Sequence, residues 1–162
     1  MPIYLDTNVF YNAYYPIEDT ISADWILKQL SPDFTGITSE WTIAEMFRGL
    51  KKQVNLKRLE NPDAQVAIDL FLSEIGEFAQ KKKIILIPVK MVNIMSSRPL
   101  ILNNNLYAAD AIHAVTAIQE KVNAFITFDK DFKRFSEIPV LNPKKELNFR
   151  DFIIDLKDKA ES

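Results

Sequence analysis

Four acidic residues stand where a carboxylate is unusual, and together they could bind a divalent metal ion. Asp6 follows the short apolar stretch IYL, and Asp129 follows the apolar stretch AFITF. Glu45 lies among apolar residues in SEWTIAEMFRGL, and Asp110 lies among alanines in LYAADAIHAVTAI. A carboxylate that folding removes from water requires a hydrogen-bonding partner, a raised pKa or a bound cation. The four residues are therefore candidates for metal binding and catalysis.

Each acid also has a simpler structural explanation. Asp6 could cap a short helix, and Asp110 could be an acid at the N-terminus of its helix. Asp129 and Asp131 could cap the turn in DKDFKRF, which is the interpretation we favour for Asp131. Glu45 could complete a capping box with Thr42, but Ser39 is the better helix start and places Glu45 inside the helix, on its apolar side. The metal-site hypothesis therefore depends on the four acids taken together.

The other side chains narrow the choice of cation. The chain has no cysteine and a single histidine, His113, so thiolate metal sites, disulfides and cysteine nucleophiles are excluded. Two carboxylates about 4 Å apart repel by about 4 kcal/mol at an effective dielectric constant of about 20, and a bound cation relieves that repulsion. Oxygen ligands alone favour Mg²⁺ or Mn²⁺. Thr7, Asn8 and Thr127 could orient the acids, and His113 is expected to pack at the edge of the site.

Short apolar stretches alternate with helical patterns along the chain. The near-continuous apolar runs at residues 3–5, 34–38, 84–89 and 124–128 are typical of strands covered on both faces. Apolar residues at three- and four-residue spacing predict helices within residues 22–30, 41–53, 68–78, 109–121 and 149–156. This alternation predicts a single α/β domain over residues 1–162, with a mainly parallel sheet flanked by helices.

The predicted sheet should bring the acids to one edge. Ligands of open parallel sheets bind beyond the carboxyl ends of the strands, and Asp6 and Asp129 follow the first and last predicted strands. Because strand ends are rigid, these two residues are the first choice for direct metal ligands, followed by Asp110. Glu45 would act either as a ligand or, through water, as a general base.

Two basic clusters follow the acids and could bind a nucleic-acid backbone. They are Arg48, Lys51 and Lys52 after Glu45, and Lys130, Lys133 and Arg134 after Asp129. Charged helix faces are usually only solvated, but closeness to the acids makes phosphate contacts an equal alternative. The tyrosines of FYNAYY could stack on unpaired bases, although such a cluster more often belongs to a core or a protein interface.

Composition sets limits on location and partners. Hydrophobic residues make up 48% and charged residues 26% of the chain, as in soluble globular domains. The absence of cysteine fits the reducing cytoplasm. The N-terminus lacks the charged start of a secretory signal, and the longest apolar run, residues 84–89, is too short to cross a membrane. We therefore expect a cytoplasmic protein that has no membrane partner.

The motifs LDTNVF, SEWTIAEMFRGL, AADAIHAVTA and ITFDKDF, in this order and spacing, resemble those of PIN domains, above all the VapC-like prokaryotic ribonucleases. The resemblance implies a three-layer α/β fold, an Mg²⁺ or Mn²⁺ site and endonucleolytic cleavage of RNA. It assigns the family's acidic positions to Asp6, Glu45, Asp110 and Asp129, its supporting polar positions to Asn8 and Thr127, and a position that is only sometimes acidic to Asp131. It also implies a toxin held inactive by a small antitoxin protein, and a homodimer.

Two other functions are consistent with the same residues. The first is a non-catalytic module with this fold that binds RNA or a protein. The second is a receiver-like phosphotransfer domain, which also gathers acids around Mg²⁺ at strand ends but needs a lysine late in the chain to hold the phosphate. Lys130 is the candidate for that lysine, and Glu45 has no role in such a domain.

Overall fold

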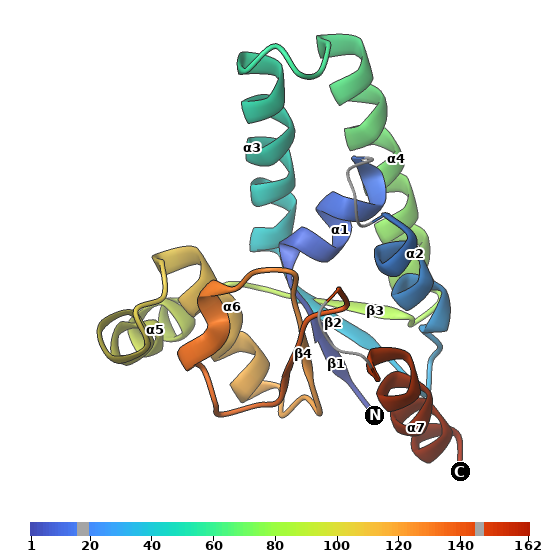
Figure 1. Cartoon of the computed structure of the whole chain (residues 1–162), viewed down its shortest axis with the longest axis vertical. Coiled ribbons are helices and arrows are strands. Elements are labelled where there is room, and N and C mark those ends of the chain that lie inside the picture. The colour runs from blue at the N-terminus through green and yellow to red at the C-terminus, as the bar shows by residue number, and fades with distance from the viewer. Residues whose placement is uncertain (16–19, 145–147) are drawn as a thin grey trace.

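A parallel sheet of five strands runs through the part of the chain that the computed structural model describes, which is residues 1–15, 20–144 and 148–162. The strands are β1 (Ile3–Leu5), β2 (Gly36–Ser39), β3 (Ile84–Ile87), β4 (Phe125–Ile126) and β5 (Val140–Leu141). Their spatial order is β3-β2-β1-β4-β5, and every neighbouring pair is parallel. The first strand of the chain therefore lies in the middle of the sheet (Figure 1).

Helices connect the strands and cover the sheet. They are α1 (Thr7–Tyr14), α2 (Thr20–Gln29), α3 (Trp41–Asn55), α4 (Asn61–Gln80), α5 (Met91–Asn104), α6 (Ala108–Gln119), the short 3₁₀ helix η1 (Asp131–Arg134) and α7 (Phe149–Glu161). In Figure 1, α3 and α4 extend together well beyond the sheet. None of the helices in the described residues combines the length and the apolar character that crossing a membrane requires.

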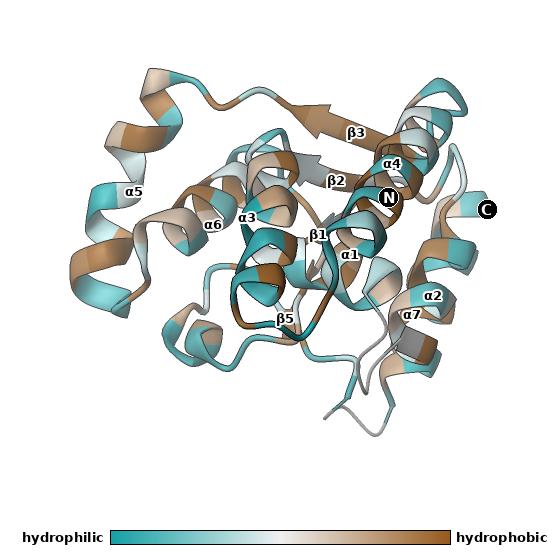
Figure 2. Cartoon of the chain, turned by 90° about the horizontal axis from the view of Figure 1, so that it is seen from above, coloured by the Kyte–Doolittle hydropathy of each residue, from teal (hydrophilic) through white to brown (hydrophobic). Residues whose placement is uncertain are grey.

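The alternation of side chains along β1 divides the core into two halves. Ile3 and Leu5 face one core, which also contains buried residues of α1, α2, α3, α4 and α7. Tyr4 faces the other core, which contains buried residues of α5, α6 and η1. Figures 1 and 2 show these two groups of helices on opposite sides of the sheet. The three-layer α/β fold expected from the sequence is thus confirmed.

Strand register determines what stands at the carboxyl edge of the sheet. β1 pairs with β2 on one side and with β4 on the other, and Leu5 lies opposite Ile126 of β4. The next residues, Asp6 and Thr127, are therefore neighbours just beyond the two strands. The direction in which successive strands are added to the sheet reverses between β1 and β4, which is where open α/β sheets form their ligand sites.

The predicted strands correspond to β1 to β4, with boundaries that differ by up to two residues at either end. The predicted helices correspond to α2, α3, α4, α6 and α7. Helix α5 and strand β5 were not predicted, and α1 and η1 were foreseen only as the short helix and the turn that an aspartate could cap. Helix α5 has a proline inside it and several apolar residues exposed, among them Met91, Met95 and Leu102, so its sequence lacks a clear buried stripe.

Candidate active site

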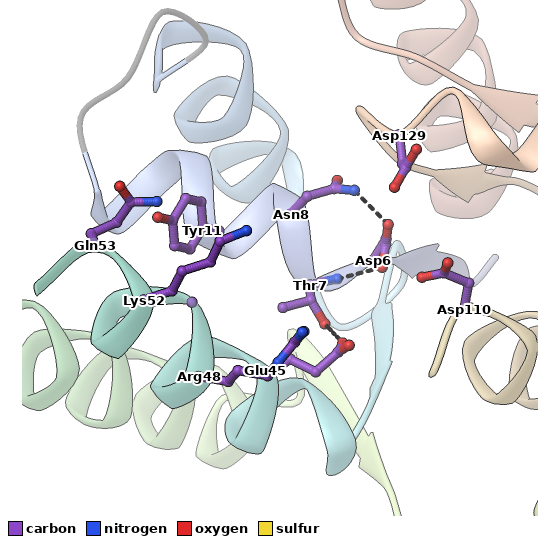
Figure 3. Close-up of a pocket in the computed structure, with 11 residues that line it drawn as sticks. Asp6, Thr7, Asn8, Tyr11, Glu45, Arg48, Lys52, Gln53, Asp110 and Asp129 are labelled. Carbon is purple, nitrogen blue, oxygen red and sulfur yellow. Dashed lines mark hydrogen bonds between the residues drawn. The ribbon is translucent and has the colours of Figure 1, made fainter. Parts of the chain in front are cut away.

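A cleft of about 310 Å³ opens at the carboxyl edge of the sheet, between α1, α3 and α6. It is lined by all four acids singled out from the sequence, together with seven other residues. The acids are Asp6, Glu45, Asp110 and Asp129, and the others are Thr7, Asn8, Tyr11, Arg48, Gly49, Lys52 and Gln53. Figure 3 shows Asp6, Asp110 and Asp129 at one end of this cleft, and Tyr11, Lys52 and Gln53 at the other.

Asp6 is held in place from three directions. Its Oδ1 accepts a hydrogen bond of 2.7 Å from the backbone N–H of Thr7, so it caps α1 as its simpler interpretation proposed. Its Oδ2 accepts hydrogen bonds from Asn8 Nδ2 at 2.6 Å and from Thr127 Oγ1 at 2.7 Å. The carboxylate is 4% exposed and lines the cleft. Capping and pocket lining are therefore two roles of one side chain.

Asn8 and Thr127 connect the acid of β1 to the acid that follows β4. Asn8 Nδ2 donates to Thr127 Oγ1 at 2.9 Å, and Asn8 Oδ1 accepts from the backbone N–H of Phe128 at 2.9 Å. The backbone N–H of Asp129 donates to Thr127 Oγ1 at 2.9 Å. These bonds fix the chain on both sides of the cleft, so Asn8 and Thr127 lie where a residue that orients the acids should lie.

Glu45 enters the cleft from the second turn of α3. The Ser39 hydroxyl accepts from the backbone N–H of Trp41 at 2.9 Å, so this helix starts after Ser39, as expected. Glu45 Oε2 accepts from Thr7 Oγ1 at 2.5 Å and lies 2.7 Å from His113 Nε2. The partner that a carboxylate at this position needs is thus a pair of side chains from α1 and α6.

From the sequence we expected His113 to pack at the edge of the site. The structure instead buries it completely beneath the site. Its Nδ1 is 2.8 Å from the Tyr4 hydroxyl, on the side of the ring away from Glu45. Burial alone would lower the pKa of His113, but the hydrogen bond to Glu45 and the charges of Asp6, Glu45 and Asp110 raise it overall. The ring joins the middle strand of the sheet to the cleft.

Asp110 lies in the first turn of α6 and has the weakest local stabilisation of the four acids. Burial, followed by the charges of Asp6, Asp129 and Glu45, raises its pKa to about 7. Among the described residues, none donates a hydrogen bond that would offset these effects. The charges of the other three acids therefore act on Asp110 in addition to its burial, while the charge of His113 opposes them.

The pKa values of Asp6 and Glu45 are shifted in opposite directions. Burial raises the pKa of Asp6, although the charge of His113 and the hydroxyl of Thr127 oppose the rise. Burial alone would also raise the pKa of Glu45, but hydrogen bonds from His113 and Thr7 lower it overall. Glu45 is therefore ionised at neutral pH, while burial favours the protonated form of both Asp6 and Asp110.

Six basic residues were candidates for binding an RNA backbone, and the structure separates them. Arg48 and Lys52 line the cleft, but Lys51 does not. Lys130 and Lys133 line a second cleft that shares Asp129 with the first. Together with Arg134, they also border a depression beside Asn105 and Tyr107. The site is therefore flanked by cations from α3 on one side and from η1 on the other.

Asp131 lies outside the acidic cleft. Asp131 is the first residue of η1, and its backbone N–H donates to Asp129 Oδ1 at 2.8 Å. Asp131 borders the same depression as Tyr107. Of the two acids that could hold the DKDFKRF turn, Asp129 is therefore the one whose carboxylate binds a backbone N–H of that turn.

Three cleft residues were not predicted from the sequence. They are Tyr11, Gly49 and Gln53. Figure 3 shows Tyr11 and Gln53 at the end of the cleft away from Asp6, Asp110 and Asp129. A Cβ atom at Gly49 would stand 2.8 Å from the ring of Tyr11, so glycine allows this ring to lie against α3. Tyr11 is one of the tyrosines of FYNAYY, a cluster that could stack on bases but more often belongs to a core or a protein interface.

The donor set of the cleft fits a hard divalent cation in chemistry, since four carboxylates and no sulfur ligand line it. The raised pKa of Asp110 also indicates uncompensated negative charge that a cation would neutralise. Within the described residues, however, no three acidic or imidazole groups stand close enough together to enclose an ion. The residues supply the ligands, without a preformed coordination shell.

Comparisons with known proteins agree with this architecture. The family model of the PIN domain matches residues 3–138. Similar folds occur in FitAcB from Neisseria gonorrhoeae, at 23% identity and a TM-score of 0.65, over 89% of this chain and 99% of that one. VapBC2 from Rickettsia felis, solved bound to a DNA fragment from its promoter, is 22% identical with a TM-score of 0.62, over 88% of this chain and 98% of that one.

A further similar fold is VapC20 from Mycobacterium tuberculosis, a sarcin-ricin loop cleaving toxin. It is 15% identical with a TM-score of 0.61, over 85% of this chain and 98% of that one. No curated protein matches the chain in sequence. Identities this low establish a shared fold and leave the activity to be argued from the site itself.

Proposed function

This chain belongs to the PIN domain family, and from that premise we propose that it is a divalent metal-dependent endoribonuclease that hydrolyses RNA phosphodiester bonds. One observation carries the proposal: Asp6, Glu45, Asp110 and Asp129, from four different elements, line a single cleft at the carboxyl edge of the sheet. Four carboxylates gathered beside exposed cations suit a metal-assisted reaction on a phosphate group. VapC20, which has a similar fold, is a toxin that cleaves the sarcin-ricin loop.

The proposed metal ligands are Asp6, Asp110 and Asp129, with Glu45 as a fourth ligand or as a proton acceptor. A bound Mg²⁺ or Mn²⁺ would supply Lewis acidity toward the scissile phosphate. Asp6 and Asp129 follow β1 and β4, where backbone and hydroxyl groups hold them. Glu45 stays ionised because His113 and Thr7 stabilise its charge, so it can accept a proton from an attacking water.

The proposed roles of the polar neighbours follow from their contacts. Thr7 holds Glu45, while Asn8 and Thr127 hold Asp6. Arg48 and Lys52 would bind RNA phosphates beside the acids, since both line the cleft. Lys130, Lys133 and Arg134 would extend that contact on the far side of Asp129. Lys51 is proposed to contribute less, because it does not line the cleft.

We also propose a protein partner, a small antitoxin that inactivates the enzyme. Solved proteins with a similar fold support this proposal. FitAB and VapBC2 were solved bound to DNA fragments, and a protein from Klebsiella pneumoniae was solved as a toxin–antitoxin complex. A homodimer is the second proposed assembly, and only the resemblance to the family supports it. A neighbouring gene for a small antitoxin-like protein would support the first.

The decisive experiment is an RNA cleavage assay with structured and unstructured RNAs, in Mg²⁺, in Mn²⁺ and in EDTA. We expect Asp129→Asn to lower cleavage by about two orders of magnitude or more, because charge stabilisation worth several kcal/mol is lost. Asp131→Asn is the matched control, since Asp131 is a near neighbour outside the cleft. Cleavage that survives EDTA, or equal losses in both variants, would refute the proposal.

Each of the two other functions predicts a different experimental outcome. A non-catalytic module would bind RNA without cutting it in any of the three conditions. A receiver-like domain would accept a phosphoryl group from acetyl phosphate on an aspartate, with Lys130 close by. Lys130 lines the second cleft and the depression beside Tyr107, not the acidic cleft, which places the candidate phosphate-binding lysine away from Asp6.

A further inference from the structure

A chain of buried polar groups runs from the middle of the sheet to the acidic cleft. The Tyr4 hydroxyl lies 2.8 Å from His113 Nδ1, and His113 Nε2 lies 2.7 Å from Glu45 Oε2. Tyr4 and His113 are both fully buried, while the Glu45 side chain keeps 19% of its surface exposed. Of these three groups, therefore, only Glu45 reaches solvent and could reach the proposed substrate.

Tyr4 is a fixed point because the core clamps its ring. It lies in β1, the middle strand, and its ring stacks on that of Phe125 with centroids 5.0 Å apart and planes 9° apart. The His113 ring meets the Tyr4 ring edge-on, with centroids 5.8 Å apart. A hydroxyl held this firmly determines which way the imidazole turns between β1 and α3.

The hydrogen-bonding capacity of the imidazole fixes which nitrogen faces Glu45. An ionised carboxylate only accepts hydrogen bonds, so His113 Nε2 must carry a hydrogen to bind Glu45. In neutral histidine Nδ1 then accepts from the Tyr4 hydroxyl, and in the cation Nδ1 donates to it. Either way, the Tyr4 hydroxyl keeps an Nε2–H directed at Glu45.

We infer that Tyr4 and His113 are positioning residues, which hold the Glu45 carboxylate in one orientation in the acidic cleft. Thr7 Oγ1 donates to the same oxygen, Oε2, at 2.5 Å, so Oε1 is left to face the reacting groups. Neither Tyr4 nor His113 lines the cleft, and both act through Glu45. The role of this positioning in RNA cleavage rests on the proposed function.

The single histidine of the chain gives a direct test that needs no RNA. In a long-range proton–nitrogen NMR spectrum of the labelled protein, every imidazole signal comes from His113. We expect wild-type protein to show a protonated Nε2. Tyr4→Phe, which removes only the hydroxyl, should keep that proton, which Glu45 requires, but should shift the Nδ1 signal and broaden the ring signals, because nothing then holds the far side of the imidazole. A wild-type Nδ1–H tautomer, or a Tyr4→Phe spectrum identical to that of the wild type, would overturn the inference.

Cleavage kinetics test the consequence for the site. We expect Tyr4→Phe to lower kcat about 10- to 100-fold, as is usual when a group supporting a site residue is removed, with little change in KM. In a Glu45→Gln background the same change should cause no further loss, because no carboxylate remains to be positioned. An additive loss in the double variant would show that Tyr4 acts by another route and would overturn the inference.

Thr116→Val provides the matched control for disturbing the buried side of α6. Thr116 is 1% exposed and lies one turn after His113, and among the described residues its hydroxyl bonds only to the backbone oxygen of Ile112, at 2.8 Å. We expect its kcat and imidazole spectrum to equal those of the wild type. If wild-type protein cleaves no RNA at all, the proposed function fails, and the NMR result alone then decides whether Glu45 is positioned.

Discussion

Asp110 is the residue at which the cost of gathering four acids is most visible. Burial and the charges of Asp6, Asp129 and Glu45 raise its pKa to about 7, and no hydrogen bond from the described residues opposes them. Asp6 is more deeply buried but is bonded by Thr7, Asn8 and Thr127. An Asp6→Asn change would disturb those bonds, so Asp110 is the better place to measure repulsion.

We expect Asp110→Asn to stabilise the metal-free protein, and more so at higher pH. The folded-state pKa is raised, so the folded state holds its proton longer than the unfolded state and loses stability as the pH rises toward about 7. Allowing for partial exposure, the gain at about pH 8 should be near 1 kcal/mol, or about 2–4 °C in Tm, and smaller at about pH 5.

Thermal melts in EDTA at these two pH values measure the effect, with Asp131→Asn as the control outside the cleft. In millimolar Mn²⁺ the order should reverse, because an ion that binds the folded wild-type protein stabilises it by mass action. A metal-free Asp110→Asn protein no more stable than wild type at the higher pH would mean that the four charges are not coupled.

The acids were predictable from the sequence because each interrupts an apolar stretch that marks its element. The role of His113 was not, because its contact with Glu45 joins residues 68 positions apart and depends on how α6 packs against α3. Its position one turn after Asp110 was the available signal. Tyr11 was missed for a related reason: its place in the cleft depends on its approach to Gly49, across α1 and α3.

At the scale of the elements, helices end here in an unusual way. Lys57, Lys82 and Lys121 follow α3, α4 and α6, and each has a φ between 53° and 57°. Each is followed by a residue whose N–H reaches back into the last turn, as Lys83 does to Phe78 O at 2.8 Å. This is the Schellman arrangement, in which glycine is the usual occupant of the left-handed position.

Lys82→Gly should therefore stabilise the protein by about 0.5–1 kcal/mol, since the left-handed conformation costs other residues about 1–2 kcal/mol and glycine loses part of that gain to chain entropy. Lys51→Gly is the control, because Lys51 is an exposed residue inside α3, where glycine should destabilise by about 1 kcal/mol. Urea unfolding measures both changes. Destabilisation by both variants would contradict the argument.

The elements that the sequence did not predict are those with the weakest local signals. β5 has two residues, Val140 and Leu141, both only partly buried, and its pairing with β4 is its main support. The apolar residues of α5 divide between a buried side with Leu100 and an exposed side with Met91, Met95 and Leu102. Such a helix has no single apolar stripe, and it is recognised only once α6 lies beside it.

For the molecule as a whole, a net charge of −2 means that the proposed binding of RNA must depend on where the cations lie. Lys52 lines the acidic cleft, and its neighbour Lys51, equally exposed on α3, does not. In an Asp129→Asn background, we expect Lys52→Ala to weaken binding of single-stranded RNA and to reduce the slope of log K against log salt by about 0.7.

Lys51→Ala should leave both quantities close to those of the parent protein. Fluorescence anisotropy over a range of salt concentrations measures the affinity and the slope together. Equal effects of the two substitutions would indicate general attraction to α3 rather than a contact inside the cleft. Arg48, which lines the same cleft, should behave like Lys52.

The central place of β1 has a consequence for the protein during its synthesis. β1 and Asp6 are translated well before β4, the neighbour of β1 on the side of Asp129. Until β4 has emerged, that border of β1 has no partner strand, and Asp6 and Asp129 are not together. If the proposed function holds, the polypeptide would gain its activity toward RNA only once β4 has joined the sheet.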